Sequence, residues 1–184
     1  MQIIRCTDSH RDAWNAFVAD EPSATFYHRF KWREINRTSF GHSSAYLAAV
    51  EADRVVGVHP IVRLNSVLFG NIACSLPFVN YGGPAAAEPS TELALLAAGS
   101  DVADHWQVDF LEIRSQRYFG DSYPSSNHKV SMTVELDPNP DVVMEAYKRE
   151  QRKEIRRAQK NGFVTRFGGV ELLEPFYRVL SESW

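Results

Sequence analysis

The segment YLAAVEADRVVGVHPIVRL, residues 46–64, contains two apolar runs separated by a short polar turn. Residues 46–51 and 55–64 are apolar segments of strand length on either side of Ala52-Asp53-Arg54, so they predict a hairpin that turns near Asp53. Residues 67–76 form a third apolar segment directly afterwards. Three adjacent short strands predict an antiparallel sheet.

Helix and strand patterns continue on both sides of this hairpin. In chain order, we expect a strand over residues 2–6, a helix over 8–19, a helix from about Tyr27 to residues 40–42, a helix over 89–106, a strand over 108–114 and a strand over 129–136. These elements predict a mixed α/β (α+β) fold, in which helices flank a largely antiparallel sheet.

Residues 141–160 are predicted to form one long helix with a strongly basic face. At ~100° per residue, five cations fall within about a third of its circumference, and Asn161-Gly162 is typical of a helix end. These cations are Arg149, Arg152, Lys153, Arg156 and Lys160. A solvated helix face is the simpler interpretation. The functional interpretation requires an anion, either a pyrophosphate-bearing substrate or an RNA backbone, because guanidinium groups bind phosphate oxygens in a fork geometry.

Residues 163–167 are predicted to form a strand and residues 170–184 a helix, which repeats the strand-then-helix order of residues 2–19. We therefore expect an N-terminal domain over residues 1–137, a linking basic helix over 138–162, and the first strand and helix of a truncated second domain over 163–184.

The charge of the chain is unevenly distributed. The formal net charge is −3, but residues 148–160 hold seven Lys/Arg against two Glu, so the rest of the chain carries −8. This contrast indicates one anion-facing surface on an acidic body and argues against a generally basic nucleic-acid coat. No apolar run approaches the ~18 residues of a membrane span, and a cytoplasmic location is expected.

The sequence contains no metal, hydrolase or dinucleotide-binding signature. Its six histidines are dispersed, and Cys6 and Cys74 are predicted to be buried free thiols. Tyr81-Gly82-Gly83 lies in a loop whose backbone could approach a ligand, although a tight turn explains the glycines equally well.

A set of motifs, ordered along nearly the whole chain, resembles the FemAB-like proteins, and most of all their branch associated with exosortase and exopolysaccharide gene clusters. The motifs are Trp32, SFGH (39–42), YLAA (46–49), RVVGVHP (54–60), LFGN (68–71), PFVNYGGP (77–84), DFLEIR (109–114) and RKEIRRAQKNG (152–162).

The resemblance implies two acetyltransferase-type (GNAT) domains around a cleft, of which this chain would hold the N-terminal part. Better-studied members transfer an amino acid from aminoacyl-tRNA to an amine of a peptidoglycan precursor. They hold substrate phosphates partly with a lysine on the helix that carries Trp32, where this chain offers Arg33 or Arg37. The Arg/Gln-x-x-Gly-x-Gly/Ala turn that cradles acetyl-CoA is absent from this sequence.

The resemblance therefore predicts an acyl or aminoacyl transferase that acts on an amine of a cell-envelope glycan or peptidoglycan-type precursor. We expect no tightly bound cofactor, with aminoacyl-tRNA or acyl-CoA as the donor. The expected partners are an anionic or lipid-linked precursor at the inner face of the membrane, tRNA, and a further C-terminal domain. The sequence assigns no catalytic residue.

Two other functions compete with the transferase. A non-catalytic module could bind RNA or another anionic polymer through the basic helix, and its binding would depend steeply on salt. A degenerate, truncated domain would instead leave Leu172, Leu173, Phe176 and Leu180 partly uncovered for association.

Overall fold

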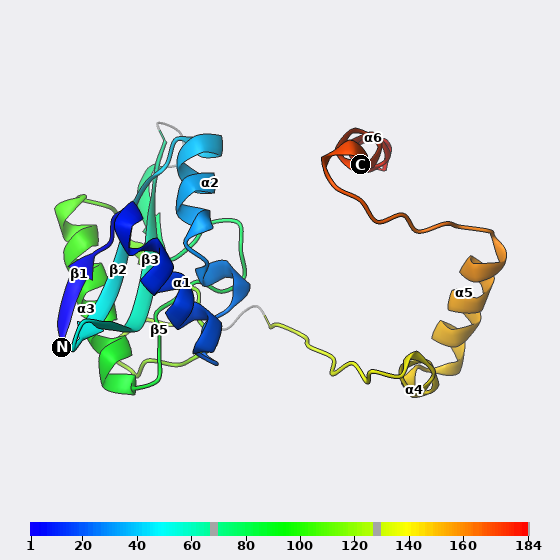
Figure 1. The fold of residues 1–184 in the computed structure, drawn as a ribbon, viewed down its shortest axis with the longest axis horizontal. Coiled ribbons are helices and arrows are strands. Elements are labelled where there is room, and N and C mark those ends of the chain that lie inside the picture. Colours follow the sequence, from blue (N-terminus) through cyan, green and yellow to red (C-terminus); the bar gives the residue numbers. More distant parts are fainter. Residues whose placement is uncertain (67–69, 127–129, 184) are drawn as a thin grey trace. The chain divides into compact units, whose positions relative to one another are not determined.

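The computed structural model describes residues 1–66, 70–126 and 130–183, which fall into two compact units, residues 1–126 and 127–184. Figure 1 shows the course of the chain through both units. The finer division at residues 137 and 162 that the sequence suggests stays a prediction.

The first unit is built on a mixed sheet whose strands run in the order β1-β2-β3-β4-β6, with β5 paired to β3. The strands are β1 (Gln2–Arg5), β2 (Ser43–Glu51), β3 (Arg54–Ser66), β4 (Gly70–Cys74), β5 (Ala85–Ala86) and β6 (Leu111–Glu112). All pairs are antiparallel except β4 with β6. The predicted fold class is therefore confirmed.

The predicted hairpin is confirmed, and it turns at Asp53 as expected. Glu51 pairs with Arg54 across a two-residue turn, in which Ala52 and Asp53 both have positive φ angles, of 47° and 59°. These angles are typical of the type I′ turn, whose twist matches that of the flanking strands. Pro60, which lacks an amide hydrogen, lies in β3 between the segments that pair with β5 and with β4.

Helices cover both faces of the sheet. Trp14 of α1 (Arg11–Asp20) packs with Tyr46 and Ala48 in one buried cluster, whereas Leu95 of α3 (Pro89–His105) packs with Leu47 in another. Adjacent residues of β2 thus point to opposite sides of the sheet, as strand geometry requires. Figure 1 shows α3 on one side and α1 on the other, which makes a three-layer arrangement.

Two short 3₁₀ turns lie before helices of the first unit. One, η1 (Asp8–His10), leads into α1, and the other, η2 (Phe26–His28), precedes α2 (Lys31–Phe40). The helix predicted from about Tyr27 therefore begins at Lys31. It ends at Gly41, whose φ of 69° is the left-handed conformation expected of a glycine C-cap.

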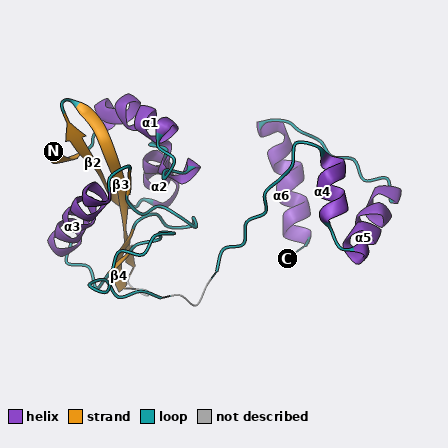
Figure 2. Ribbon diagram, turned by 90° about the horizontal axis from the view of Figure 1, so that it is seen from below, coloured by secondary structure: helices purple, strands orange, loops and turns teal. Residues whose placement is uncertain are grey.

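The second unit contains three separate α-helices and one 3₁₀ turn in its described part (Figure 2). They are α4 (Pro140–Ala146), α5 (Arg149–Lys160), η3 (Val170–Leu172) and α6 (Leu173–Glu182). No residue between 130 and 183 is buried. Over the described ranges of both units, no helix has the length and apolar character needed to cross a bilayer.

Several strand predictions are wrong or too long. Residues 130–136 and 163–167 form no strand, because a strand requires a hydrogen-bonded partner and the described chain gives them none. The strand expected over residues 108–114 is limited to β6, and the one over 67–76 is seen as β4. Residues 67–69, 127–129 and 184 lie outside the described residues.

The single helix predicted over residues 141–160 is also wrong, because Tyr147 and Lys148 adopt extended backbone angles between α4 and α5. A side chain stabilises this break. The Arg152 guanidinium donates hydrogen bonds to the carbonyls of Glu145 and Tyr147, both at 2.9 Å. These bonds satisfy carbonyls that a continuous helix would have used in its own ladder.

Candidate functional site

The basic residues of α5 line a hollow of about 780 Å³ within the second unit. Its walls are Met144 and Glu145 from α4 and, from α5, Arg149, Arg152, Lys153, Arg156, Arg157 and Lys160. The structure thus brings together all five cations that the helical periodicity placed on one face. It adds Arg157, which lies next to Arg156 and outside the narrower face predicted from the sequence.

The charge of this hollow is strongly positive, since its walls hold six cations and the single carboxylate of Glu145. Arg157 also lies 3.7 Å from Glu154, but both side chains are largely exposed, so that pair is screened by water. Arg152 differs from its neighbours because it holds the junction of α4 and α5. Such a concentration of guanidinium and ammonium groups fits a ligand with several phosphate oxygens.

Of the predicted residues of the first unit, Trp32 lies near the loop that contains Tyr81, Gly82 and Gly83, which we call the glycine loop. Trp32, together with Tyr27, packs on a small buried cluster of Val62, Leu76 and Val79. Because Val79 belongs to the loop after β4, this contact places Trp32 close to the loop that contains Tyr81. The aromatic ring of Trp32 also lies 6.0 Å from that of Tyr27.

The amides of the glycine loop donate hydrogen bonds to another part of the protein. Gly82 and Gly83 both donate to the carbonyl of Arg114, at 3.0 and 2.9 Å, and the Arg114 guanidinium donates to the carbonyl of Val79 at 3.0 Å. A Cβ added at Gly82 would lie 2.8 Å from that of Leu76. The glycines therefore permit close internal packing, which is the simpler of the two interpretations that the sequence allowed.

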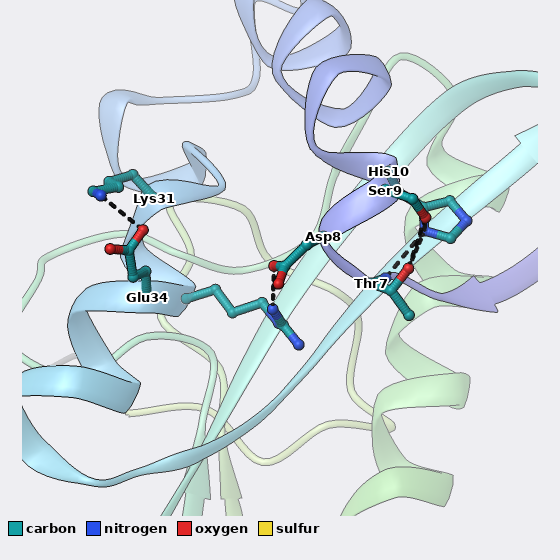
Figure 3. A network of polar contacts seen from close by, with 7 residues as sticks. Thr7, Asp8, Ser9, His10, Lys31 and Glu34 are labelled. Atoms are coloured by element: carbon teal, nitrogen blue, oxygen red, sulfur yellow. Dashed lines mark hydrogen bonds and ion pairs between the residues drawn. The ribbon is translucent and has the colours of Figure 1, made fainter.

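The two arginines of α2 have different surroundings. Arg33 is paired with Asp8 at 2.6 Å, an interaction drawn in Figure 3 from Asp8, and its guanidinium lies 5.7 Å from the ring centre of Phe30. Arg37 is exposed on the last turn of the helix. Because the charge of Arg33 is already neutralised by Asp8, Arg37 is the better placed of the two to meet an anion.

Two histidines are buried beneath these segments. His28 donates from Nε2 to the carbonyl of Gly83 at 2.8 Å, and His59 donates from Nδ1 to the carbonyl of Leu95 at 3.1 Å. Burial lowers the pKa of His28, and it lowers the pKa of His59 to about 4. Both rings are therefore neutral near pH 7 and fix the backbone of neighbouring elements.

Two thiols and one carboxylate of the first unit are buried in its interior. Cys6 and Cys74 are buried and free, as predicted, and burial raises the pKa of Cys6 to about 11 and of Cys74 to about 12. Buried Glu92, whose pKa is raised by burial, pairs with Arg117 at 3.0 Å. Among the described residues, no group of His, Cys, Asp or Glu has a metal-binding arrangement.

No protein-family model matches the sequence, and no curated protein matches it. Among solved structures, the chain is similar to FemX, with 17% identity and a TM-score of 0.43 over 59% of this chain and 25% of that one. It thus spans about a quarter of the length of FemX.

Two full-length similarities are to acetyltransferases. One is a GNAT family acetyltransferase from Staphylococcus aureus, with 14% identity and a TM-score of 0.49 over 73% of this chain and 100% of that one. The other is a ribosomal-protein-alanine N-acetyltransferase from Brucella melitensis, with 10% identity and a TM-score of 0.45 over 74% and 100%. Similarities at this level assign no function to the chain, since one fold can carry many unrelated functions.

Proposed function

We propose that this chain is part of an acyl or aminoacyl transferase that modifies an amine of a cell-envelope glycan or peptidoglycan-type precursor. In this proposal, the hollow lined by α5 holds the phosphate groups of one substrate. The precursor is anionic or lipid-linked and is met at the inner face of the membrane. A further C-terminal domain completes the enzyme.

The observation that carries the proposal is the composition of the hollow, in which six cations face one carboxylate. Aminoacyl-tRNA, acyl-CoA and a diphosphate-linked precursor all carry phosphates at a distance from the reacting carbonyl or amine. Contacts with these remote groups would hold the reacting atoms close together, and positioning supplies much of the rate of acyl transfer. The resemblance of the sequence motifs to FemAB-like proteins supports the same reaction class.

The reaction itself is tested by incubating the complete enzyme, with its C-terminal domain, with labelled aminoacyl-tRNA or acetyl-CoA and with an amine-bearing peptidoglycan precursor. We expect the label to move from the ester or thioester carbonyl to the acceptor amine as a new amide. Absence of transfer from either donor by folded protein would contradict the proposal. Salt-sensitive RNA binding without transfer would favour the RNA-binding module instead.

The role of the hollow is tested by the double substitution Arg156→Glu/Lys160→Glu, which reverses two of its charges and leaves the structural Arg152 in place. We expect the KM for the phosphate-bearing substrate to rise by roughly tenfold or more, because attraction becomes repulsion. The matched control is Arg166→Glu/Arg178→Glu, which makes the same charge change in the same unit outside the hollow. Equal effects of the two double variants would remove the hollow from the mechanism.

A further inference from the structure

The hollow lined by α5 depends on the bend in the chain between α4 and α5. Its walls come from both helices, with Met144 and Glu145 on α4 and six cations on α5. Figure 1 shows α4 end-on and α5 from the side, so the two helix axes point in clearly different directions. A single straight helix has a convex surface along its whole length. The same residues on one straight helix would therefore enclose no hollow.

The backbone at the bend has ordinary extended angles. Tyr147 has φ −71° and ψ 149°, and Lys148 has φ −60° and ψ 153°. Neither residue is Gly or Pro, so a straight helix over residues 140–160 is available to this sequence. In that helix, the carbonyls of Glu145 and Tyr147 would accept hydrogen bonds from the amides four residues later. The bent form therefore competes with a straight one.

Packing does not fix the bend. No residue between 130 and 183 is buried, so no apolar core holds α4 at its angle to α5. Hydrogen bonds hold it instead. The Lys148 amide donates to the side chain of Gln151 at 3.1 Å. Arg152 donates from Nη1 to the carbonyls of both Glu145 and Tyr147, each at 2.9 Å. One side chain thus replaces two bonds of the straight helix.

These bonds distinguish Arg152 from the other cations of the hollow. Arg152 is half-buried, whereas Arg156 and Lys160 are exposed. A hydrogen bond from a charged donor is stronger than one between neutral groups, so the two bonds from Arg152 favour the bent form. Removal of this side chain would leave both carbonyls to water or to the amides of a straight helix. The balance would then move toward the straight form.

We propose that Arg152 is a positioning residue, which forms the phosphate-binding hollow by holding the chain bent against a competing straight helix over residues 140–160. The anion binds only the bent form, so anion binding and the bend stabilise each other. This inference rests on the phosphate-binding role proposed above for the hollow, but the geometry of the bend can be measured without any ligand.

Electron paramagnetic resonance on the whole protein, with spin labels at Asp141→Cys and Asn161→Cys, would measure the bend. Cys6 and Cys74 are buried, so the labels should attach only to the introduced cysteines. A straight helix places residues 141 and 161 about 30 Å apart, at about 1.5 Å per residue, and any bend shortens this distance. We expect the shorter distance with Arg152 present and about 30 Å in Arg152→Ala.

The matched control is Arg156→Ala, which removes an identical side chain from the wall of the hollow one turn later on α5. It should keep the short distance. A distance of about 30 Å with Arg152 present, or a short distance in Arg152→Ala, would overturn the proposal whatever the hollow binds.

Calorimetry with inorganic pyrophosphate separates positioning from direct contact. Arg152→Ala/Lys148→Pro should restore the bend without the guanidinium, because proline fits the φ of Lys148 and favours the extended angles that Tyr147 already has. Arg152→Ala/Lys148→Ala makes the same charge change but leaves the straight helix accessible. We expect the proline variant to bind pyrophosphate roughly tenfold more tightly than the alanine variant, since apparent affinity scales with the fraction of molecules in the binding form.

Equal affinities of these two double variants would show that Arg152 acts by contact alone, and its positioning role would be wrong. Failure of the protein with Arg152 to bind pyrophosphate has a different meaning. It would overturn the phosphate-binding role of the hollow, and the measured distances would then decide whether Arg152 holds the bend.

Discussion

His59 makes the stability of the first unit dependent on pH. Its ring is completely buried, its Nε2 has no hydrogen-bond partner among the described residues, and burial lowers its pKa from 6.5 to about 4. Between these two pH values, the imidazole of His59 is protonated in the unfolded chain but neutral in the folded chain. Stability therefore falls as the pH drops from about 6.5 to 4, and the fall levels off below the folded-state pKa.

We expect the free energy of unfolding to decrease by about 3 kcal/mol over this interval on account of His59 alone. Urea unfolding at pH 7, 5.5 and 4 would measure it, and the slope should become shallower in His59→Leu. The control is His105→Leu, which replaces an exposed histidine at the end of α3 and should keep the wild-type slope of unfolding free energy against pH. An identical slope in wild type and His59→Leu would show that the buried imidazole is not the cause.

The residues in the tight turn between β2 and β3 are not those best suited to its conformation. Ala52 and Asp53 both occupy positive φ, which Asn and Gly tolerate better than other residues. The double substitution Ala52→Asn/Asp53→Gly should therefore raise stability by about 1 kcal/mol and the Tm by about 3 °C in a thermal unfolding experiment. Ala52→Val, which places a β-branched residue at the same angle, should lower it.

Local pattern was sufficient for elements that are stabilised by their own neighbours. The two apolar runs of residues 46–64 predicted β2, β3 and their turn, because a hairpin that helices cover on both faces is apolar at nearly every position. The pattern failed for residues 130–136, where apolar and polar residues alternate as in a strand, because the presence of a partner strand is not a local property of the sequence. The apolar residues there, such as Met132 at 93% exposure, remain uncovered.

The break between α4 and α5 was not predicted, because Tyr147 and Lys148 are neither Gly nor Pro, and Lys148 is not one of the residues preferred at an N-cap. The one local signal is Gln151, whose side chain accepts a hydrogen bond from the Lys148 amide at 3.1 Å. The side chain of Arg152 stabilises the break further by donating hydrogen bonds to carbonyls five and seven residues earlier. Helical periodicity still grouped the cations of α5 correctly, since they all follow the break. The amides of Gly82 and Gly83 donate to the carbonyl of Arg114, which is more than thirty residues away in the sequence. The sequence of the loop therefore does not indicate this partner.

The two units differ in how their stability arises. Residues 1–126 contain all the buried clusters of the described chain, whereas residues 130–183 bury no side chain completely. A chain segment without buried apolar surface has little to offset the entropy of ordering it, and a helix of 12 residues such as α5 is marginal in water.

We therefore expect residues 1–126, produced alone, to unfold in one cooperative thermal transition followed by circular dichroism. Residues 127–184, produced alone, should show weak helicity that declines gradually with temperature. A cooperative transition in the shorter fragment would mean that it forms a core that its described residues do not contain. Loss of folding in the longer fragment would mean that it needs the second unit.

The thirteen-residue strand β3 also restricts how this chain can vary in length. It pairs with β2 along one edge and with β4 and β5 along the other. Deleting or inserting one residue within it would exchange inward and outward side chains against three neighbours at once. Insertions and deletions among natural relatives should therefore collect at the ends of the hairpins, while the central strand keeps a constant number of residues.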